Sequence, residues 1–274
     1  MIKAGVIGHP IKHSKSPLIH GHWIEQHNLQ GTYEAIDIAP ENLKDDVQQL
    51  IDQGYAGFNV TIPHKETIME LCDEIVGNAK TCGAVNTVVI DGGKIIGHNT
   101  DAFGFIANIK QAHPDFDFTS GPAVVLGAGG AARAVVAGLI DEGVPEVIIT
   151  NRTRARAEKI AEDMNAYTDR ISVKDWGDRS EILEGANLLV NSSSLGMDGQ
   201  PALEIDLEKL SADALVTDIV YAPLQTDLLK AAAENGNKTV TGIGMLLHQA
   251  RPAFKEWFGV MPDVDEDLER LVLG

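Results

Sequence analysis

In the stretch Pro122-Ala123-Val124-Val125-Leu126-Gly127-Ala128-Gly129-Gly130-Ala131-Ala132-Arg133, a short apolar run stops at a glycine-rich turn. A turn of this kind between a strand and a helix is typical of dinucleotide-binding α/β domains. Gly127 permits the tight turn, Gly129 lets the backbone approach a pyrophosphate, and the small Ala132 lets the helix pack on the strand. The helix N-terminus directs N–H groups and partial positive charge at the phosphates. Alone the pattern is a weak signal, because such turns also occur without a ligand.

A second strand-like run, Val147-Ile148-Ile149-Thr150, stops at Asn151-Arg152-Thr153, and Arg154 and Arg156 follow. NAD-binding domains carry an acidic residue roughly 20 residues after the glycine turn, where it bonds the ribose 2′-hydroxyl. A carboxylate would repel a 2′-phosphate, whereas guanidinium groups match it. Arginine at a helix start also opposes the helix dipole unless an anion is present. The two turns together predict NADP as the cofactor, and therefore a redox enzyme.

Length and charge narrow the class of protein. The chain has 274 residues, enough for two domains, and a net charge of −18. So acidic a protein is a poor partner for nucleic acid. We find no segment that would span a bilayer, no signal peptide, and only two cysteines, Cys72 and Cys82. We therefore expect a cytoplasmic protein without a metal site, a nucleic-acid partner or a membrane partner.

Short apolar runs alternate with amphipathic stretches along the chain, which is typical of βαβ units. The strand-like runs are residues 4–8, 33–38, 56–62, 85–90, 95–98, 123–126, 147–150, 171–173, 188–191, 215–219 and 239–241. The clearest helix-like stretches are residues 17–27, 43–53, 65–72, 102–111 and 245–257. Asp91-Gly92-Gly93 predicts a hairpin. The expected fold is α/β with two domains: an N-terminal mixed, mostly parallel sheet, a Rossmann-like NADP-binding domain, and a cleft between them.

Polar residues gather where several of these runs end. Asn59 and Thr61 share one face of a predicted strand, and Lys65 follows at a predicted helix start. Asn86 and Asp101 stand at the ends of later runs. Taken singly, each of these residues also has a purely structural explanation, such as a cap or a solvated side chain.

Two serines precede the first predicted helix. Ser16 followed by Pro17 predicts a helix N-cap and first turn, which explains Ser16 but not Ser14. Because Ser14 and Ser16 are two apart on an extended segment, they point the same way and could hold a carboxylate.

Seven segments together resemble the shikimate dehydrogenase family, in the family's order and over nearly the whole chain. They are His13-Ser14-Lys15-Ser16-Pro17, Asn59-Val60-Thr61-Ile62-Pro63-His64-Lys65, Gly83-Ala84-Val85-Asn86-Thr87, Asn99-Thr100-Asp101, Gly127-Ala128-Gly129-Gly130-Ala131, Asn151-Arg152-Thr153, and Gly242-Ile243-Gly244-Met245 with Gln249. The loop Asn191-Ser192-Ser193-Ser194-Leu195-Gly196-Met197 departs from the family's more usual loop, which contains Thr-Pro. That departure leaves open the cofactor contacts beyond the glycine turn.

The resemblance implies reversible NADP-dependent reduction of 3-dehydroshikimate to shikimate, in chorismate and aromatic amino-acid biosynthesis. It implies proton transfer by Lys65, with Asp101 beside it. The implied substrate-binding residues are Ser14, Ser16, Asn59, Thr61, Asn86, Tyr221 and Gln249. The implied cofactor-binding residues are Gly127, Ala128, Gly129, Gly130, Ala131, Asn151, Arg152, Thr153, Arg156, Ile219 and Gly242. The implied substrate-binding domain is discontinuous, residues 1–101 plus 242–274, and the NADP-binding domain is residues 102–241.

Other functions stay open at this point. A quinate/shikimate dehydrogenase with relaxed cofactor use would need to accept an extra tertiary hydroxyl near Ser14. A non-catalytic NADP-binding regulator of the same fold is the alternative outside enzymes, and the presence of Lys65 and Asp101 argues against it. Charge and length permit either a monomer or a homodimer.

Overall fold

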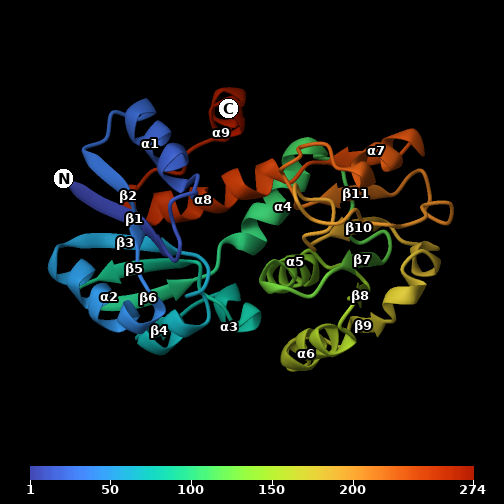
Figure 1. The fold of residues 1–274 in the computed structure, drawn as a ribbon, viewed down its shortest axis with the longest axis horizontal. Helices are drawn as coiled ribbons and strands as arrows, with labels where there is room; N and C mark the ends of the chain where they lie inside the picture. The colour runs from blue at the N-terminus through green and yellow to red at the C-terminus, as the bar shows by residue number, and fades with distance from the viewer. The chain divides into compact units, whose positions relative to one another are not determined.

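The computed structural model describes all residues from Met1 to Gly274, which form two compact units. One unit comprises Met1–Gly104 with Leu247–Gly274, and the other comprises Phe105–Leu246. The boundaries fall inside two helices, α4 (Asp101–Ala112) and α8 (Ile243–Phe258), so each of these helices contributes to both units (Figure 1). None of the helices combines the length and the apolar character that a bilayer crossing requires.

The first unit contains a mixed sheet of six strands in the order β2-β1-β3-β5-β6-β4. Its strands are β1 (Ile2–Gly8), β2 (Gly31–Asp37), β3 (Tyr55–Val60), β4 (Glu74–Ile75), β5 (Thr87–Asp91) and β6 (Lys94–His98). Strand β1 runs parallel to β2 and β3, whereas β5 runs antiparallel to both β3 and β6. The predicted hairpin is confirmed: Asp91 pairs with Lys94, and Gly92 and Gly93 both have positive φ.

The helical elements of this unit differ from prediction in two places. They are α1 (Ser16–Gln26), η1 (Pro40–Asn42), α2 (Leu43–Asp52), η2 (Thr67–Leu71), α3 (Asn78–Cys82) and α9 (Glu266–Leu273). The helix predicted over residues 65–72 is a short 3-10 helix, η2, because the Lys65 carbonyl accepts a hydrogen bond from Val85 N (2.8 Å). The predicted Ser16 cap is also wrong. Helix α1 already includes Ser16, whose backbone N–H donates to Ser14 Oγ (3.3 Å).

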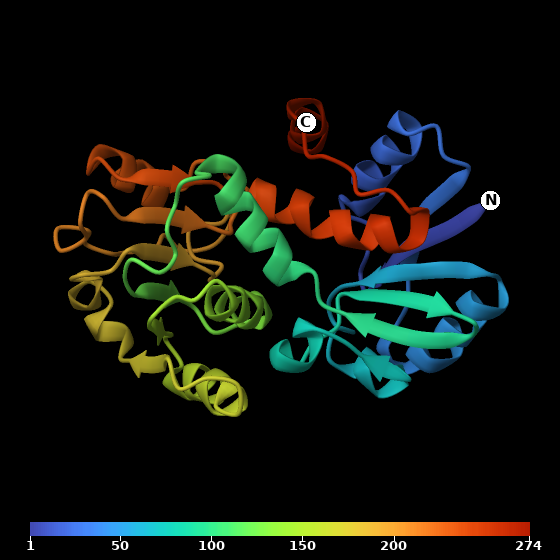
Figure 2. The ribbon, with the colours of Figure 1, turned by 180° about the vertical axis from the view of Figure 1, so that it is seen from behind.

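Helices cover both faces of this sheet, with α2 on one side and α8 on the other, as Figure 1 and Figure 2 show together. Val47 and Leu50 of α2 pack in the core formed by strand residues such as Phe58. On the other face, Trp257 of α8 donates from Nε1 to the Val88 carbonyl (3.0 Å). The main chain of Gly57 lies directly under this contact. A Cβ there would lie 2.1 Å from the Val88 oxygen and 2.2 Å from Trp257 Nε1.

The second unit contains an all-parallel sheet of six strands in the order β12-β11-β10-β7-β8-β9. The strands are β7 (Ala123–Leu126), β8 (Val147–Thr150), β9 (Ile171–Lys174), β10 (Leu188–Asn191), β11 (Leu215–Asp218) and β12 (Lys238–Val240). Its helical elements are α5 (Gly130–Asp141), α6 (Arg154–Met164), η3 (Trp176–Asp178), η4 (Glu181–Leu183) and α7 (Asp227–Glu234). The chain moves outward from β7 to β9 and then returns to the other side of β7 as β10. This reversal places the topological switch point beside β7, where such sheets bind ligands.

We expect Gly57→Ala to destabilise the protein by about 2 kcal/mol or more, because the added methyl group would overlap backbone and the Trp257 indole. Urea unfolding followed by circular dichroism measures the loss. Gly21→Ala is the matched control. It lies in helix α1 with no atom within 4 Å of the added Cβ, and alanine favours a helix over glycine by about 1 kcal/mol. Equal stability of Gly57→Ala and the wild type would contradict the packing described.

We expect stability to fall with acid partly through His20, whose pKa burial lowers from 6.5 to about 3. As pH falls through 6.5, His20 takes up a proton in the unfolded chain but stays neutral in the folded chain. The contribution of neutral His20 to the free energy of unfolding is therefore complete above pH 6.5. It is lost as pH falls towards 3, by at most about 1.4 kcal/mol per pH unit. The variant His20→Phe keeps the ring that stacks on Tyr33 and should flatten the pH dependence of urea unfolding. The exposed His27→Phe should leave it unchanged, and an equally steep dependence in His20→Phe would refute the assignment.

Candidate functional site

The glycine turn after β7 has the geometry that a bound dinucleotide needs. Gly127 has a φ of +111°, and a Cβ on it would lie 2.9 Å from both Ser192 Oγ and Ser193 N. Glycine is therefore required here by conformation and by space. Gly129 precedes α5, and the space around its missing Cβ is open to at least 4 Å. The backbone at the α5 N-terminus is thus accessible to a ligand such as a pyrophosphate.

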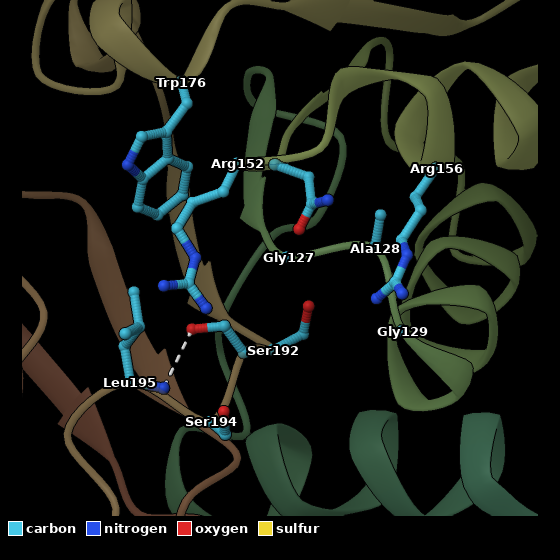
Figure 3. A pocket seen from close by; sticks show the side chains of 11 residues that line it. Gly127, Ala128, Gly129, Arg152, Arg156, Trp176, Ser192, Ser194 and Leu195 are labelled. Atoms are coloured by element: carbon cyan, nitrogen blue, oxygen red, sulfur yellow. Dashed lines mark hydrogen bonds between the residues drawn. The ribbon is translucent and has the colours of Figure 1, made fainter. Parts of the chain in front are cut away.

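A pocket of about 200 Å³ lies over this turn, and all of its lining belongs to the second unit (Figure 3). It is lined by Gly127, Ala128, Gly129, Asn151, Arg152, Arg156, Trp176, Ser192, Ser193, Ser194 and Leu195. Six of the predicted cofactor residues are thereby brought together. Gly130 and Ala131 begin α5, and Thr153 precedes α6, but these three do not line the pocket.

The charged side chains that line this pocket are all basic, which favours an anionic ligand. No acidic side chain lines it, although the chain carries 40 acidic and 22 basic residues. Arg152 and Arg156 form no ion pair, whereas Arg154 between them pairs with Glu158 (2.7 Å) and Asp175 (2.8 Å). Figure 3 shows the Arg152 and Arg156 side chains reaching into the pocket from different sides. Two unpaired guanidinium groups without a carboxylate fit a dinucleotide with an extra phosphate, as predicted for NADP.

Ile219 and Gly242, also predicted to contact the cofactor, meet each other at a different place in the second unit. A Cβ on Gly242 would lie 2.4 Å from the Ile219 oxygen and 2.6 Å from the Val220 oxygen. The Asp218 carboxylate fixes this segment, because it accepts hydrogen bonds from Val220 N (3.0 Å) and Thr226 Oγ1 (2.7 Å). Burial raises the pKa of Asp218 above its usual value. Tyr221 follows directly and is 39 % exposed.

The first unit holds a second cluster, centred on Lys65 and Asp101. Lys65 Nζ donates to Asp101 Oδ2 (2.6 Å), and Asn86 Nδ2 donates to Asp101 Oδ1 (2.8 Å). The Lys65 side chain is 30 % exposed and that of Asp101 is 14 % exposed. An ammonium group has three N–H donors, so this ion pair leaves Lys65 with donors that can face a ligand.

A buried hydrogen-bond network supports this ion pair. Asn86 Oδ1 accepts from Thr100 N (2.8 Å) and from Thr87 Oγ1 (3.0 Å). Asn59 donates to Thr87 Oγ1 (3.0 Å) and accepts from the Tyr33 hydroxyl (2.6 Å). Asn59 therefore uses its amide to hold its neighbours, and its direct contact with a substrate stays a prediction.

The other predicted substrate residues lie in different parts of the chain. Gln249 of α8 joins the cluster, since its Oε1 lies 3.5 Å from Asn86 Nδ2. Ser16 interacts with the Tyr33 hydroxyl, and burial raises the pKa of Tyr33 well above its usual value. Thr61 directly follows β3, with its Cγ2 against Gly8. Tyr221 belongs to the second unit.

Sequence reasoning missed several residues that the structure brings to these two sites. Trp176 lines the pocket from the end of β9, and Tyr33 and Thr100 join the network around Asn86. An aromatic residue a few positions after a predicted strand end was a usable signal for Trp176. Thr100 stands in the segment Asn99-Thr100-Asp101 that carries the family resemblance, whereas nothing in the sequence distinguishes Tyr33 from an ordinary core residue.

Known proteins match this chain over its whole length. Family models match at residues 6–88 (shikimate dehydrogenase substrate binding domain), 110–197 (shikimate / quinate 5-dehydrogenase) and 242–271 (shikimate 5′-dehydrogenase C-terminal domain). The shikimate dehydrogenase (NADP(+)) of Paramagnetospirillum magneticum is 50% identical over 99% of this chain and 98% of that protein. The relative of the same name from Paracoccus denitrificans is 49% identical over 99% of this chain and 95% of its own.

Solved structures of shikimate and quinate dehydrogenases also match this chain over nearly its whole length. Shikimate 5-dehydrogenase from Thermus thermophilus, in complex with NADP(H) and shikimate, has a TM-score of 0.86 and 36% identity, covering 100% of this chain and 99% of that one. Quinate dehydrogenase from Corynebacterium glutamicum, in complex with NAD, has a TM-score of 0.90 and 31% identity, covering 99% and 97%. The family models, the full-length relatives and these structures confirm the two-domain α/β fold, and the chain belongs to the shikimate dehydrogenase family.

Proposed function

We propose that this chain is a shikimate dehydrogenase that interconverts 3-dehydroshikimate and shikimate with NADP, as the names of its relatives indicate. The observation that carries the proposal is the ion pair of Lys65 and Asp101, held by Asn86 in a cluster with further donors to offer. A quinate/shikimate enzyme with relaxed cofactor use is not favoured, because the acid that binds the NAD ribose is missing from the pocket. A non-catalytic regulator would have no need for the Lys65–Asp101 pair.

The two units take different parts in this proposal. Substrate binding belongs to residues 1–101 plus 242–274, and cofactor binding to residues 102–241. The support is that the Lys65 cluster lies wholly in the first observed unit and the arginine-lined pocket wholly in the second. A cytoplasmic location stays a prediction, and so does the expectation that the protein is either a monomer or a homodimer.

When bound, the cofactor supplies the hydride for reduction and accepts it in oxidation. The Lys65 Nζ, held by Asp101, is the group placed to give a proton to the oxygen of a carbonyl under reduction. Asp101 accepts one Nζ hydrogen and thereby aims the remaining donors, while Asn86 fixes the Asp101 carboxylate. Ser14 and Ser16 hold the substrate carboxylate. Asn59, Thr61, Asn86 and Gln249, all of the first unit, contact the ring hydroxyl groups and the reacting carbonyl, and Tyr221 of the second unit stays a predicted substrate contact.

In the cofactor pocket, Gly127, Ala128 and Gly129, with Gly130 and Ala131 at the start of α5, receive the pyrophosphate. The unpaired Arg152 and Arg156, with Asn151 and Thr153, hold the 2′-phosphate and its ribose. Ile219 and Gly242 lie by the nicotinamide.

Consumption of NADPH with 3-dehydroshikimate, followed by absorbance, tests the proposed function directly. We expect turnover with shikimate and NADP in the reverse direction, and poor turnover with quinate or with NAD. Equal rates on shikimate and quinate with both cofactors would support the relaxed enzyme instead. Cofactor binding without any turnover would support the regulator.

We expect Lys65→Ala to lower kcat by about 10²- to 10⁴-fold, the usual contribution of a general acid–base group. NADP affinity, measured by calorimetry, should be retained because Lys65 does not line the cofactor pocket. Lys44→Ala removes an exposed lysine of α2 in the same unit and should leave both quantities unchanged. Near-normal turnover of Lys65→Ala would remove Lys65 from the mechanism.

We expect Arg152→Ala to raise KM for NADP by about 10- to 100-fold, because a hydrogen bond to a charged group contributes about 1.5–3 kcal/mol. KM for NAD should change far less, since NAD lacks the phosphate. Steady-state kinetics with both cofactors measures the difference. Lys230→Ala, an exposed lysine of α7 in the same unit, is the control. If the two KM values rise equally, Arg152 has no role in phosphate recognition.

A further inference from the structure

Trp176 is the one aromatic side chain among those lining the cofactor pocket. It begins η3, two residues after the end of β9, which is an edge strand of the second sheet. Figure 3 shows its indole beside the Arg152 side chain, on the opposite side of the pocket from Arg156. The indole also packs against the core beneath the sheet, so one part of it is anchored while another part faces the pocket.

Two arginines fix the position of this indole. Arg179 Nη1 donates to the Trp176 carbonyl (3.1 Å), and the guanidinium carbon lies 5.1 Å from the centroid of the indole ring. Arg179 is itself held by the Glu204 carbonyl (2.6 Å from Nε). On the other side, Arg154 ties Asp175, the residue before Trp176, to the start of α6 (2.8 Å). A flat ring held in this way loses little conformational entropy when a ligand contacts it.

The strand order indicates which part of a dinucleotide reaches Trp176. The glycine turn follows β7, Arg152 follows β8, and Trp176 follows β9, and these three strands lie side by side in that order. A dinucleotide with its pyrophosphate at the first turn and its 2′-phosphate at Arg152 extends towards β9. The group attached to that ribose is adenine, a flat base that aromatic rings bind by stacking.

We propose that Trp176 is a binding residue for the adenine ring of the cofactor, and that Arg154 and Arg179 are positioning residues that act through it. This inference rests on the proposed binding of NADP in the same pocket. Trp176 contributes to cofactor affinity and takes no part in proton transfer. The contribution of one stacked base corresponds to about ten-fold in affinity.

The test compares Trp176→Leu, which keeps apolar contact with the core, with Trp176→Phe, which keeps an aromatic ring. The probe is adenosine 2′,5′-bisphosphate, the half of NADP that carries adenine and the extra phosphate, measured by calorimetry on the full chain. We expect Kd to rise about ten-fold in Trp176→Leu and clearly less in Trp176→Phe. Tyr167→Leu removes an aromatic residue of the same unit that is 58 % exposed and does not line the pocket, and it should bind like the wild type.

A second measurement separates stacking from a structural role. Reduced nicotinamide mononucleotide lacks the adenosine half, so its turnover with 3-dehydroshikimate should be the same in Trp176→Leu and the wild type. Intrinsic fluorescence gives a further signal, because the other tryptophans, Trp23 and Trp257, are buried in the first unit. The bisphosphate should change the emission of the wild type but not that of Trp176→Phe.

An unchanged Kd in Trp176→Leu, or an equal loss with the mononucleotide, would overturn the inference. Failure of the proposed function gives a different result. In that case the wild type would bind the bisphosphate through Trp176 and still not turn over shikimate. If the wild type turns over shikimate and Trp176→Leu binds the bisphosphate normally, only the role of Trp176 is refuted and the proposed function stands.

Discussion

The candidate catalytic site depends on the side-chain amide of Asn86. Its oxygen accepts from the Thr100 backbone and its nitrogen donates to Asp101, so one buried group joins strand β5 to the start of α4. Asp101 then holds the Lys65 ammonium at 2.6 Å. A buried amide that lost these partners would carry the full cost of desolvation, which is why the network behaves as a unit. Asn86 thus sets the position of Lys65, the proposed proton donor, through Asp101.

Charge organises the second unit in a comparable way. In a chain with a net charge of −18, an unpaired arginine readily finds an acidic neighbour, and Arg154 has two. Arg152 and Arg156 have none, and no acidic residue lines the pocket that they enter. Their charges remain available for a ligand. The same separation of roles makes Arg154 a structural residue that holds the turn before Trp176.

Much of the fold could be predicted from sequence because its signals are local. Strand β7 and the turn at Gly127 lie within a few residues of each other, and the hairpin at Gly92 and Gly93 is equally local. Prediction failed where a distant partner decides. The stretch after Lys65 became a short 3-10 helix because the distant Val85 N–H donates to the Lys65 carbonyl. The error at Ser16 is local, since α1 begins one residue earlier than expected and includes Ser16. The confirmed family and fold rest on motifs spread over the whole chain, so these errors left them unaffected.

By itself, the sequence determined the α/β class, the glycine cradle and the kind of cofactor, since residue type and spacing along one strand and one turn carry that information. Only the tertiary structure decided which arginines are unpaired, how Asn86 joins Lys65 to its scaffold, and that Trp176 reaches the cofactor pocket. Each of these depends on distances between residues far apart in the chain. Those distances are fixed by the order of strands in a sheet and by the packing of helices on it.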